Sequence, residues 1–141
     1  LPIYGDGLQV RDWIYVNDHV EAIVKILEKG KIGETYNIGG NNETKNIEIV
    51  KLICLILDEI KPSSIEGIKK YSELITYVKD RAGHDRRYAL QIKKINNELE
   101  WSPHESLKTG IRKTIEWYLN NLDWCNKVKG KNYSGERLGL L

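Results

Sequence analysis

The sequence has few of the residues from which disulfide frameworks and metal sites are built. Its 141 residues include two cysteines and three histidines. Cys54 and Cys125 do not make a disulfide framework, and Cys54 lies in an apolar helical pattern that is typical of a core residue. The histidines are widely separated, and no Cys-x-x-Cys or His-x-x-x-His spacing occurs. We therefore expect no metal site and a reducing, cytoplasmic setting.

Methionine and long hydrophobic runs are also missing. Because a complete translation product begins with methionine, the lack of this residue leads us to expect a processed protein or a piece of a longer one. The longest apolar stretch, residues 52–57, is about a third of the roughly 18 residues that a membrane span needs. No basic segment followed by an apolar one opens the chain, so we expect neither a retained secretory signal nor a membrane partner.

Charge of one sign is not in excess. The chain holds 22 Lys and Arg against 20 Asp and Glu, which gives a formal net charge of +2. This near balance argues against a nucleic-acid partner. A composition of 40% hydrophobic and 30% charged residues is typical of a folded globular domain. The length allows at most one ordinary domain.

Short strands and helices alternate along the chain, which predicts an α/β fold. The predicted strands are residues 1–4, 11–16, 34–38 and 74–78. The predicted helices are residues 18–29, 46–60, 92–99 and 103–122. Asn17 is expected to cap the first helix, and Ser102 the last through a Ser-x-x-Glu capping box. We expect one structured region over residues 1–126, followed by a flexible basic tail over residues 127–141.

A charged run follows the fourth predicted strand. It consists of Asp80, Arg81, Ala82, Gly83, His84, Asp85, Arg86 and Arg87. Such runs are usually solvated loops. However, this run mixes both signs of charge, and Gly83 lets the backbone approach a ligand closely. Arginine also suits phosphate, because its planar fork binds two oxygens at once. The run is therefore either a solvated loop or an anion site.

Two other residues can serve an anion site. Asn46 begins a predicted helix, and a helix N-terminus offers free N–H groups and a partial positive charge; the alternative is an ordinary cap. Arg11 begins a predicted strand, and its alternative role is a buried ion pair with Asp12 or another acid. The Gly-x-Gly at residues 5–7 is interpreted as a plain turn. A dinucleotide fingerprint would need glycine in place of Val10 and a helix directly afterwards.

Several stretches resemble one known family. They are residues 1–7, 10–16, 18–19, 33–40, Glu43, Asn46, 80–89, 111–114 and 116–118. There the chain resembles the carboxyl-terminal part of the dTDP-glucose 4,6-dehydratases, extended short-chain dehydrogenases/reductases that act on nucleotide sugars. The Arg-Asp-Trp-Ile-Tyr-Val element is shared among extended nucleotide-sugar enzymes, whereas Asp-Arg-x-Gly-His-Asp-Arg-Arg-Tyr is more specific to the 4,6-dehydratases. The resemblance implies the substrate-binding part of an NAD(P)-binding Rossmann-fold enzyme.

The resemblance also implies roles for individual residues in binding a dTDP-sugar. They are Pro2, Ile3, Tyr4, Arg11, Asn46, Asp80, Arg81, Ala82, Gly83 and His84. In the family the first three lie beside the thymine, where an apolar and aromatic wall suits a flat base. Arg11 and Asn46 lie at the pyrophosphate, and the last five surround the nucleotide. Ala82 replaces the usual proline, so we expect a less rigid loop, and Gln91 replaces the aspartate that normally caps the next helix.

The chemistry that the resemblance implies needs groups that this sequence lacks. Family members oxidise the sugar C4 with NAD, eliminate water across C5 and C6, and return the hydride to C6. They use a Gly-rich Rossmann turn, a Tyr-x-x-x-Lys pair and an Asp-Glu pair. Neither Gly-x-x-Gly-x-x-Gly nor Gly-x-Gly-x-x-Gly occurs in the sequence, and no tyrosine is followed by lysine four residues later. We therefore expect no catalytic residue in this chain, no turnover by it alone, and NAD bound by the amino-terminal half of a homodimeric parent.

Two alternative functions stay open. The first is a related UDP- or GDP-sugar epimerase or decarboxylase, which the run at residues 80–88 disfavours. The second is a non-catalytic nucleotide-sugar-binding module or a basic RNA-binding domain, which the charge balance disfavours.

The resemblance has one structural implication. In extended reductases the strand at residues 35–38 and the helix before it lie near the Rossmann sheet. The predicted helix at residues 46–60 is apolar around most of its circumference and must be covered on more than one side. We therefore expect the isolated chain to expose apolar surface and to aggregate.

Overall fold

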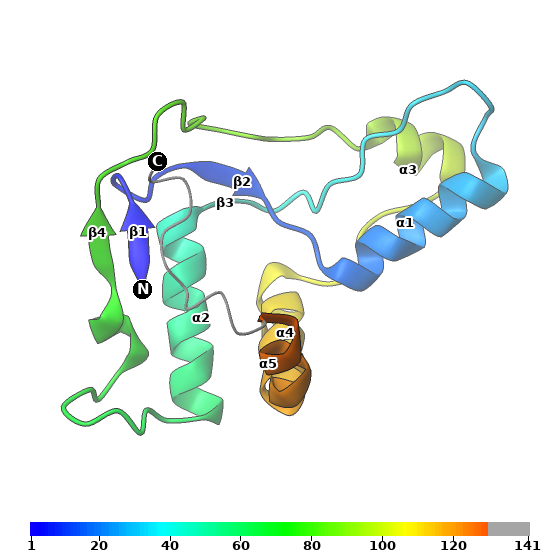
Figure 1. Ribbon diagram of the computed structural model, residues 1–141. Helices are drawn as coiled ribbons and strands as arrows, with labels where there is room; N and C mark the ends of the chain where they lie inside the picture. The colour runs from blue at the N-terminus through cyan, green and yellow to red at the C-terminus, as the bar shows by residue number, and fades with distance from the viewer. Residues whose placement is uncertain (130–141) are drawn as a thin grey trace.

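The computed structural model describes residues 1–129 and shows short strands and helices in alternation (Figure 1). The strands are β1 (Pro2–Tyr4), β2 (Val10–Asp12), β3 (Glu43–Lys45) and β4 (Thr76–Val78). The α-helices are α1 (Val16–Lys29), α2 (Asn46–Ile60), α3 (Lys93–Leu99), α4 (Leu107–Asn120) and α5 (Leu122–Lys129). A 3₁₀ helix, η1 (Tyr71–Leu74), precedes β4. Within residues 1–129 no helix is long and apolar enough to cross a membrane.

The strands form two small sheets within the described residues. β1 pairs in parallel with β4, and β2 pairs antiparallel with β3. The segment after β4 then returns to β2, where Val10 forms a parallel bridge with Arg87. Parallel strands need a long crossover, and here the crossover contains β2, α1, β3, α2 and η1. The pairing therefore places the segment that follows β1 and the segment that follows β4 at the same edge of the sheet.

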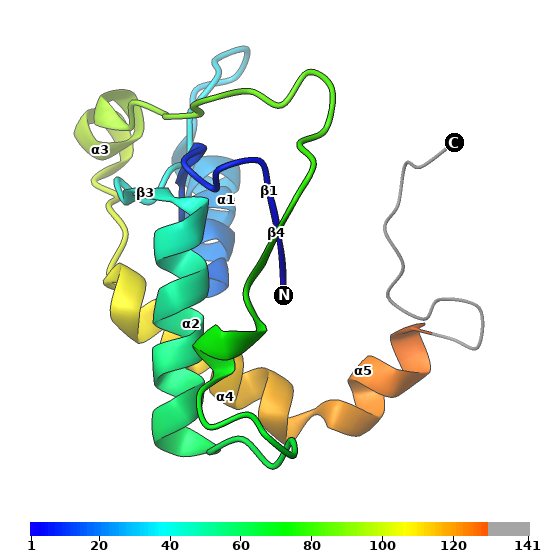
Figure 2. The same cartoon turned by 90° about the vertical axis from the view of Figure 1, so that its left-hand side faces the viewer.

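Helix α2 occupies the centre of one half of the molecule, and its bounds match the sequence prediction. It contacts β3, η1 and α4, so it is covered on several sides, as its apolar circumference requires (Figure 2). Its buried residues are Ile47, Ile49, Cys54 and Ile56. The prediction that Cys54 belongs to the core is confirmed.

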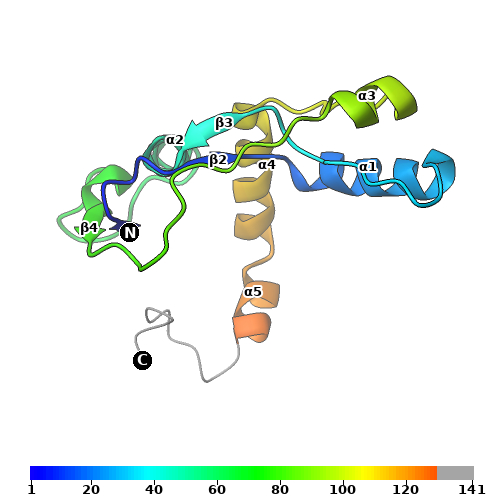
Figure 3. The same cartoon turned by 90° about the horizontal axis from the view of Figure 1, so that it is seen from above.

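A second core joins α1 to α3, in the arm that extends away from α2 (Figure 3). Its buried members are Ala22, Ile95, Leu99 and Trp101. Ile14, Ile26, Tyr36, Ile38 and Ile92 pack against them. The arm is therefore held together by one face of α1.

The opposite face of α1 is apolar and exposed. Its members, Val16, Val20, Ile23, Val24 and Leu27, are between 41% and 81% exposed. The predicted strand at residues 34–38 is wrong, because a strand needs a hydrogen-bonded neighbour and no strand of residues 1–129 pairs with it. Both features agree with the expectation that this part of the chain exposes apolar surface.

Two helix starts differ from the sequence prediction. Helix α4 begins at Leu107 and is capped by Ser106, whose hydroxyl accepts from the Thr109 N–H at 3.2 Å. Ser102 is not its cap, because the Glu105 N–H is held at 3.0 Å by the buried Asp18 carboxylate of α1, which keeps the preceding segment extended.

The start of α1 and its preceding strand also differ. Tyr15 stands at the N-cap position, so Asn17 lies inside the first turn of α1 and is not the cap. The predicted strand at residues 11–16 ends at Asp12, because its partner β3 is only three residues long.

The carboxyl-terminal boundary is later than expected. Helix α5 continues to Lys129, so residues 127–129 belong to a helix and not to a tail. The amphipathic pattern weakens after Trp124, but Leu122–Lys129 still completes two turns of helix. The rest of the predicted tail, residues 130–141, lies outside the described residues.

The exposed face of α1 predicts self-association of the 141-residue chain. We expect the double substitution Val24→Glu and Leu27→Glu to raise the monomer fraction severalfold in light scattering, because the charges interrupt a contiguous apolar patch. Glu28→Lys, on the same helix, changes charge without removing apolar surface and is the control. A wild-type chain that stays monomeric and unfolds in a sharp, reversible transition would contradict this prediction.

Candidate functional site

The candidate site is built where the carboxyl ends of β1 and β4 lie side by side. The parallel register pairs Tyr4 with Val78, so the turn after β1 and the charged run after β4 leave the sheet at the same edge. The Gly5 N–H donates to the Val78 carbonyl at 3.0 Å, and this bond holds the turn after β1 against the end of β4. The start of α2 lies at the same edge, because the Ile47 N–H donates to the Gly7 carbonyl at 3.0 Å.

The turn at residues 5–7 requires both of its glycines. Gly5 and Gly7 have φ of +60° and +71°, which residues with a Cβ rarely adopt. A Cβ on Gly5 would also lie 2.5 Å from Asp80 Oδ2, and one on Gly7 would lie 2.7 Å from Ile3 Cγ2. The segment is a turn that leads into β2, as expected from the sequence.

Asp80 and His84 form a pair inside the charged run. His84 Nδ1 lies 2.7 Å from Asp80 Oδ1, and the His84 side chain is only 6% exposed. The Arg81 N–H also donates to Oδ1, at 2.9 Å. The hydrogen bond with His84, together with that from Arg81, holds the pKa of Asp80 below its usual value, although desolvation opposes this. Gly83, with φ of +66° and open space around it, turns the loop between them.

Arg11 reaches the same run from β2. Its guanidinium lies over the Tyr88 ring, 4.6 Å from the centroid, and donates to the carbonyls of Val10 at 2.7 Å and Asp85 at 2.9 Å. Within residues 1–129 it forms no ion pair with an acid, so the alternative of a buried pair with Asp12 is wrong. Instead the Asp12 carboxylate accepts from a main-chain N–H at 2.8 Å. Arg11 is therefore oriented by neutral groups and not by a carboxylate.

The other arginines of the run divide into paired and unpaired ones. Arg86 donates three hydrogen bonds of 3.0–3.1 Å to the Asp6 carboxylate. Arg87 donates two, at 2.9 and 2.6 Å, to Glu43. No acid in the described part of the chain pairs with Arg81. The partners of Arg86 and Arg87 both come from outside the run.

Tyr88 supports this arrangement from the end of the run. Its hydroxyl hydrogen bonds to the Asp85 carboxylate, and this contact raises the pKa of Tyr88. The Tyr88 N–H also donates to the Val10 carbonyl at 3.0 Å. Tyr88 is a residue whose individual role could not be predicted from the sequence. Its contacts hold the Tyr88 ring in the orientation in which the Arg11 guanidinium lies over it.

Asn46 is the first residue of α2, and Lys45 occupies the N-cap position. The interpretation of Asn46 as an ordinary cap is therefore wrong. Its N–H donates to the Gln9 carbonyl at 3.0 Å, while its side-chain amide has no hydrogen-bond partner among residues 1–129. An unused amide at a helix N-terminus can bind an anion.

The residues expected beside the base lie on β1. Pro2 is exposed and Tyr4 is half-buried, whereas Ile3 is buried on the opposite face of the strand. Alternation along a strand explains this division. A flat base on the exposed face would meet the side chains of Pro2 and Tyr4, and Ile3 would reach it only through its main chain.

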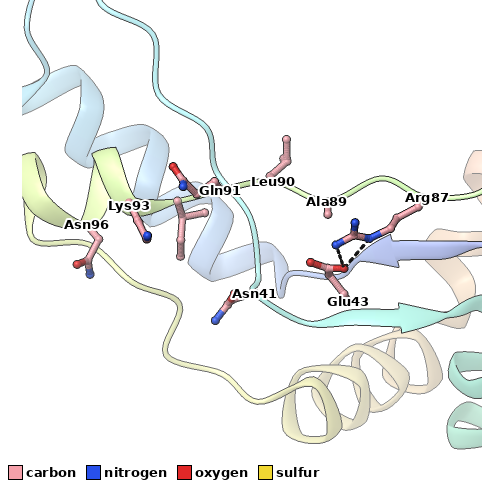
Figure 4. A pocket seen from close by; sticks show the side chains of 9 residues that line it. Asn41, Glu43, Arg87, Ala89, Leu90, Gln91, Lys93 and Asn96 are labelled. Carbon is pink, nitrogen blue, oxygen red and sulfur yellow. Dashed lines mark hydrogen bonds and ion pairs between the residues drawn. The ribbon is translucent and has the colours of Figure 1, made fainter.

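The described part of the structure has two cavities, and none of the site residues predicted from the sequence lines either of them. One, of about 610 Å³, is bounded by Asn41, Glu43, Arg87, Ala89, Leu90, Gln91, Ile92, Lys93 and Asn96. Figure 4 shows Arg87 and Glu43 turned toward each other at one end of it. The other, of about 930 Å³, is lined mostly by apolar groups between α2 and α4, among them Trp13, Ile53 and Trp117. The residues predicted from the sequence therefore form an open surface outside both cavities.

Metal-binding side chains do not converge in the described part of the chain. No group of three or more His, Cys, Asp or Glu side chains there is arranged to hold a metal ion. Among residues 1–129 the Asp80–His84 pair has no third His, Cys, Asp or Glu side chain placed to share a metal ion.

Residues 1–114 match the family model described as GDP-mannose 4,6 dehydratase. The chain belongs to this family. Over its full length it is 55% identical to a dTDP-glucose 4,6-dehydratase of Escherichia coli and covers 39% of that protein. The chain thus spans about 39% of the length of such relatives and corresponds to their carboxyl-terminal part.

Solved structures of the family agree with this fold. A Bacillus anthracis dTDP-glucose 4,6-dehydratase in complex with NAD matches with a TM-score of 0.74 and 46% identity, over 88% of this chain and 36% of that one. A Streptomyces venezuelae dTDP-glucose 4,6-dehydratase with NAD and thymidine diphosphate bound matches with a TM-score of 0.73 and 37% identity, over 88% and 35%. The expected resemblance and fold class, the carboxyl-terminal part of an extended Rossmann-type reductase, are confirmed.

Proposed function

We propose that the chain is the substrate-binding part of an NAD-dependent dTDP-glucose 4,6-dehydratase, which converts dTDP-glucose into dTDP-4-keto-6-deoxyglucose and water. The observation that carries this proposal is the convergence of Arg11, Asn46 and the run at residues 80–84 at one edge. Three segments far apart in sequence meet there and offer unneutralised cationic and amide donors. A relative that is 55% identical over the whole chain is named for this reaction.

Each proposed contact has a chemical reason. Arg11 and Asn46 bind the pyrophosphate, because a guanidinium fork and an amide at a helix N-terminus both suit anionic oxygens. Pro2, Ile3 and Tyr4 lie beside the thymine. The segment from Asp80 through Arg81, Ala82 and Gly83 to His84 closes around the nucleotide. Residues 1–126 form the nucleotide-sugar-binding region of the enzyme.

Residues 1–129 lack the glycine-rich turn and following helix that bind a dinucleotide. A dinucleotide site needs a glycine-rich turn that opens a helix, whereas the turn at residues 5–7 leads into β2 and is closed by the Asp80 carboxylate. We therefore assign NAD to a part of the enzyme outside this chain. We also assign the enzyme to the cytoplasm, where nucleotide sugars and NAD are available, as a homodimer that needs no nucleic acid or membrane.

The whole protein, expressed from its complete coding sequence, tests the proposal. With NAD and dTDP-glucose we expect the 4-keto-6-deoxy sugar, and we expect the 141-residue chain alone to give none. UDP-glucose and GDP-mannose are the comparison substrates. Product from the isolated chain would contradict the assignment of catalysis to another part, and a higher kcat/KM for a UDP- or GDP-sugar would contradict the choice of nucleotide.

One observation favours a second candidate. The family model that matches residues 1–114 is described by GDP-mannose 4,6 dehydratase activity, so a GDP-sugar is the rival substrate. The two candidates share the elimination chemistry and differ in the base. A purine is larger than thymine, so the surface beside Pro2 and Tyr4 is where the difference in affinity would arise.

A further inference from the structure

Gln9 connects two of the segments that form the candidate site. It lies between the turn at residues 5–7 and β2, and it is only 2% exposed. Its side-chain Nε2 donates to Asp80 Oδ2 at 3.1 Å, and its main-chain carbonyl accepts from the Asn46 N–H at 3.0 Å. We propose that Gln9 is a positioning residue for the nucleotide site, an inference that rests on the proposed function of that site.

The Asp80 carboxylate carries the effect of Gln9 to the binding loop. Asp80 Oδ1 accepts from the Arg81 N–H at 2.9 Å and lies 2.7 Å from His84 Nδ1. Gln9 holds the other oxygen, Oδ2, so these hydrogen bonds of the carboxylate all depend on one orientation of its plane. Without Gln9 the carboxylate can rotate toward solvent, and Arg81 and His84 lose their fixed acceptor. Gln9 therefore orients residues that we place around the nucleotide without touching the nucleotide itself.

The other end of Gln9 fixes the start of α2. Its carbonyl holds the Asn46 N–H, and the neighbouring Gly7 carbonyl holds the Ile47 N–H. These two bonds satisfy N–H groups that a helix N-terminus otherwise leaves free. They also set the direction in which Asn46 presents its side chain. One residue thus sets the spacing between the pyrophosphate contact of α2 and the loop at residues 80–84.

The surroundings of the Gln9 side chain allow its bond to Asp80 to be removed without a large loss of stability. Its Oε1 is buried and has no hydrogen-bond partner in the described part of the chain. A buried acceptor without a donor is unfavourable, so a leucine of similar size removes an unfavourable group together with the bond to Asp80. Asp80 itself is partly exposed and can be solvated when that bond is lost. Gln9→Leu is therefore expected to keep the fold while it releases the loop.

The inference is tested in the whole protein with Gln9→Leu and Gln9→Glu. We expect both to raise the KM for dTDP-glucose about tenfold, the effect of one hydrogen bond to a charged group, with kcat changed less than about twofold. Gln91→Leu, the same change at an exposed glutamine, is the matched control and should leave both constants unchanged. The melting temperature of Gln9→Leu should stay within a few degrees of the wild type.

The Gln9→Glu variant adds a pH readout. Its introduced carboxyl group would face Oδ2 of the Asp80 carboxylate, while His84 contacts Oδ1. Asp6, which is paired with Arg86, is the other acidic group nearby. The low pKa of Asp80 keeps that group charged, so acid protonates the introduced carboxyl group first and restores a donor. The ratio of variant to wild-type KM should therefore fall as the pH is lowered from about 8 to about 5.5.

Hydrogen exchange separates failure of the inference from failure of the proposed function. In the ligand-free protein, exchange of the Arg81 amide should be about tenfold faster in Gln9→Leu than in the wild type, and unchanged in Gln91→Leu. If the wild type does not convert dTDP-glucose, the proposed function fails and the Arg81 amide still decides the inference. Unchanged exchange overturns it, as does an unchanged KM in an active enzyme, or a parallel loss of kcat and melting temperature.

Discussion

Replacing Arg11 with alanine in the whole protein is expected to raise the KM for dTDP-glucose roughly 30-fold. The guanidinium is oriented by two main-chain carbonyls and the Tyr88 ring, and no acid of the described chain neutralises it. A charge-assisted bond to a pyrophosphate oxygen contributes about 2 kcal/mol, which corresponds to that factor. Arg11→Lys keeps the charge but loses the planar fork, so it should recover only part of the affinity.

Arg86→Ala is the matched control for Arg11→Ala. Arg86 lies on the same charged run, but its guanidinium is occupied by Asp6 in an exposed ion pair. Removing such a pair changes stability by at most about 1 kcal/mol, and we expect the KM to change less than about threefold. Steady-state kinetics with dTDP-glucose measure both variants. Equal effects at the two positions would show that general positive charge, rather than the placed fork of Arg11, attracts the substrate.

Trp101→Ala is expected to lower the free energy of unfolding by about 3–5 kcal/mol. Trp101 is 1% exposed and packs with Ala22, Ile95 and Leu99 in the core that joins α1 to α3. Its carbonyl also accepts from Asn96 Nδ2 at 3.2 Å. Truncation removes the largest buried side chain of this core and leaves a cavity among Ala22, Ile95 and Leu99.

The indole nitrogen of Trp101 makes phenylalanine an informative comparison. Nε1 is buried without a partner in the described residues, and Trp101→Phe removes this unpaired donor while it keeps most of the apolar contact. We expect Trp101→Phe to destabilise the protein far less than Trp101→Ala, by about 1 kcal/mol. Denaturant unfolding followed by circular dichroism measures both. A loss below about 1 kcal/mol for Trp101→Ala would show that the arm is not stabilised by this core.

Elements with a strong local pattern could be predicted from the sequence. Helix α2 was predicted with its observed bounds because its apolar residues and its turn boundaries are close in sequence. The predicted strand at residues 34–38 failed because strand formation depends on a partner, and residues 1–129 supply none. The predicted cap at Ser102 failed because Asp18, 87 positions from Glu105, holds the preceding segment.

The candidate site shows the same limit. The run at residues 80–87 was recognisable from its composition and from a family resemblance, but its pairings were not. Asp6 lies 80 positions from Arg86, and Glu43 lies 44 positions from Arg87. Gln9 gave no sequence signal, because nothing local distinguishes a buried glutamine from an exposed one. Its importance depends on contacts with Asp80 and Asn46 that exist only after folding.

The parallel pairing of β1 with β4 has a consequence for the order of folding. The Leu1 nitrogen donates to the carbonyl of Leu74, 73 positions away, and the strands pair directly beside this contact. Closing so long a segment loses chain entropy before any contact compensates for it, so pairings of this kind form late. Local helices such as α2 and α4 can form first. The surface that joins β1 to the run at residues 80–88 is then among the last parts to assemble, and a bound nucleotide sugar would favour the completed fold over its precursors.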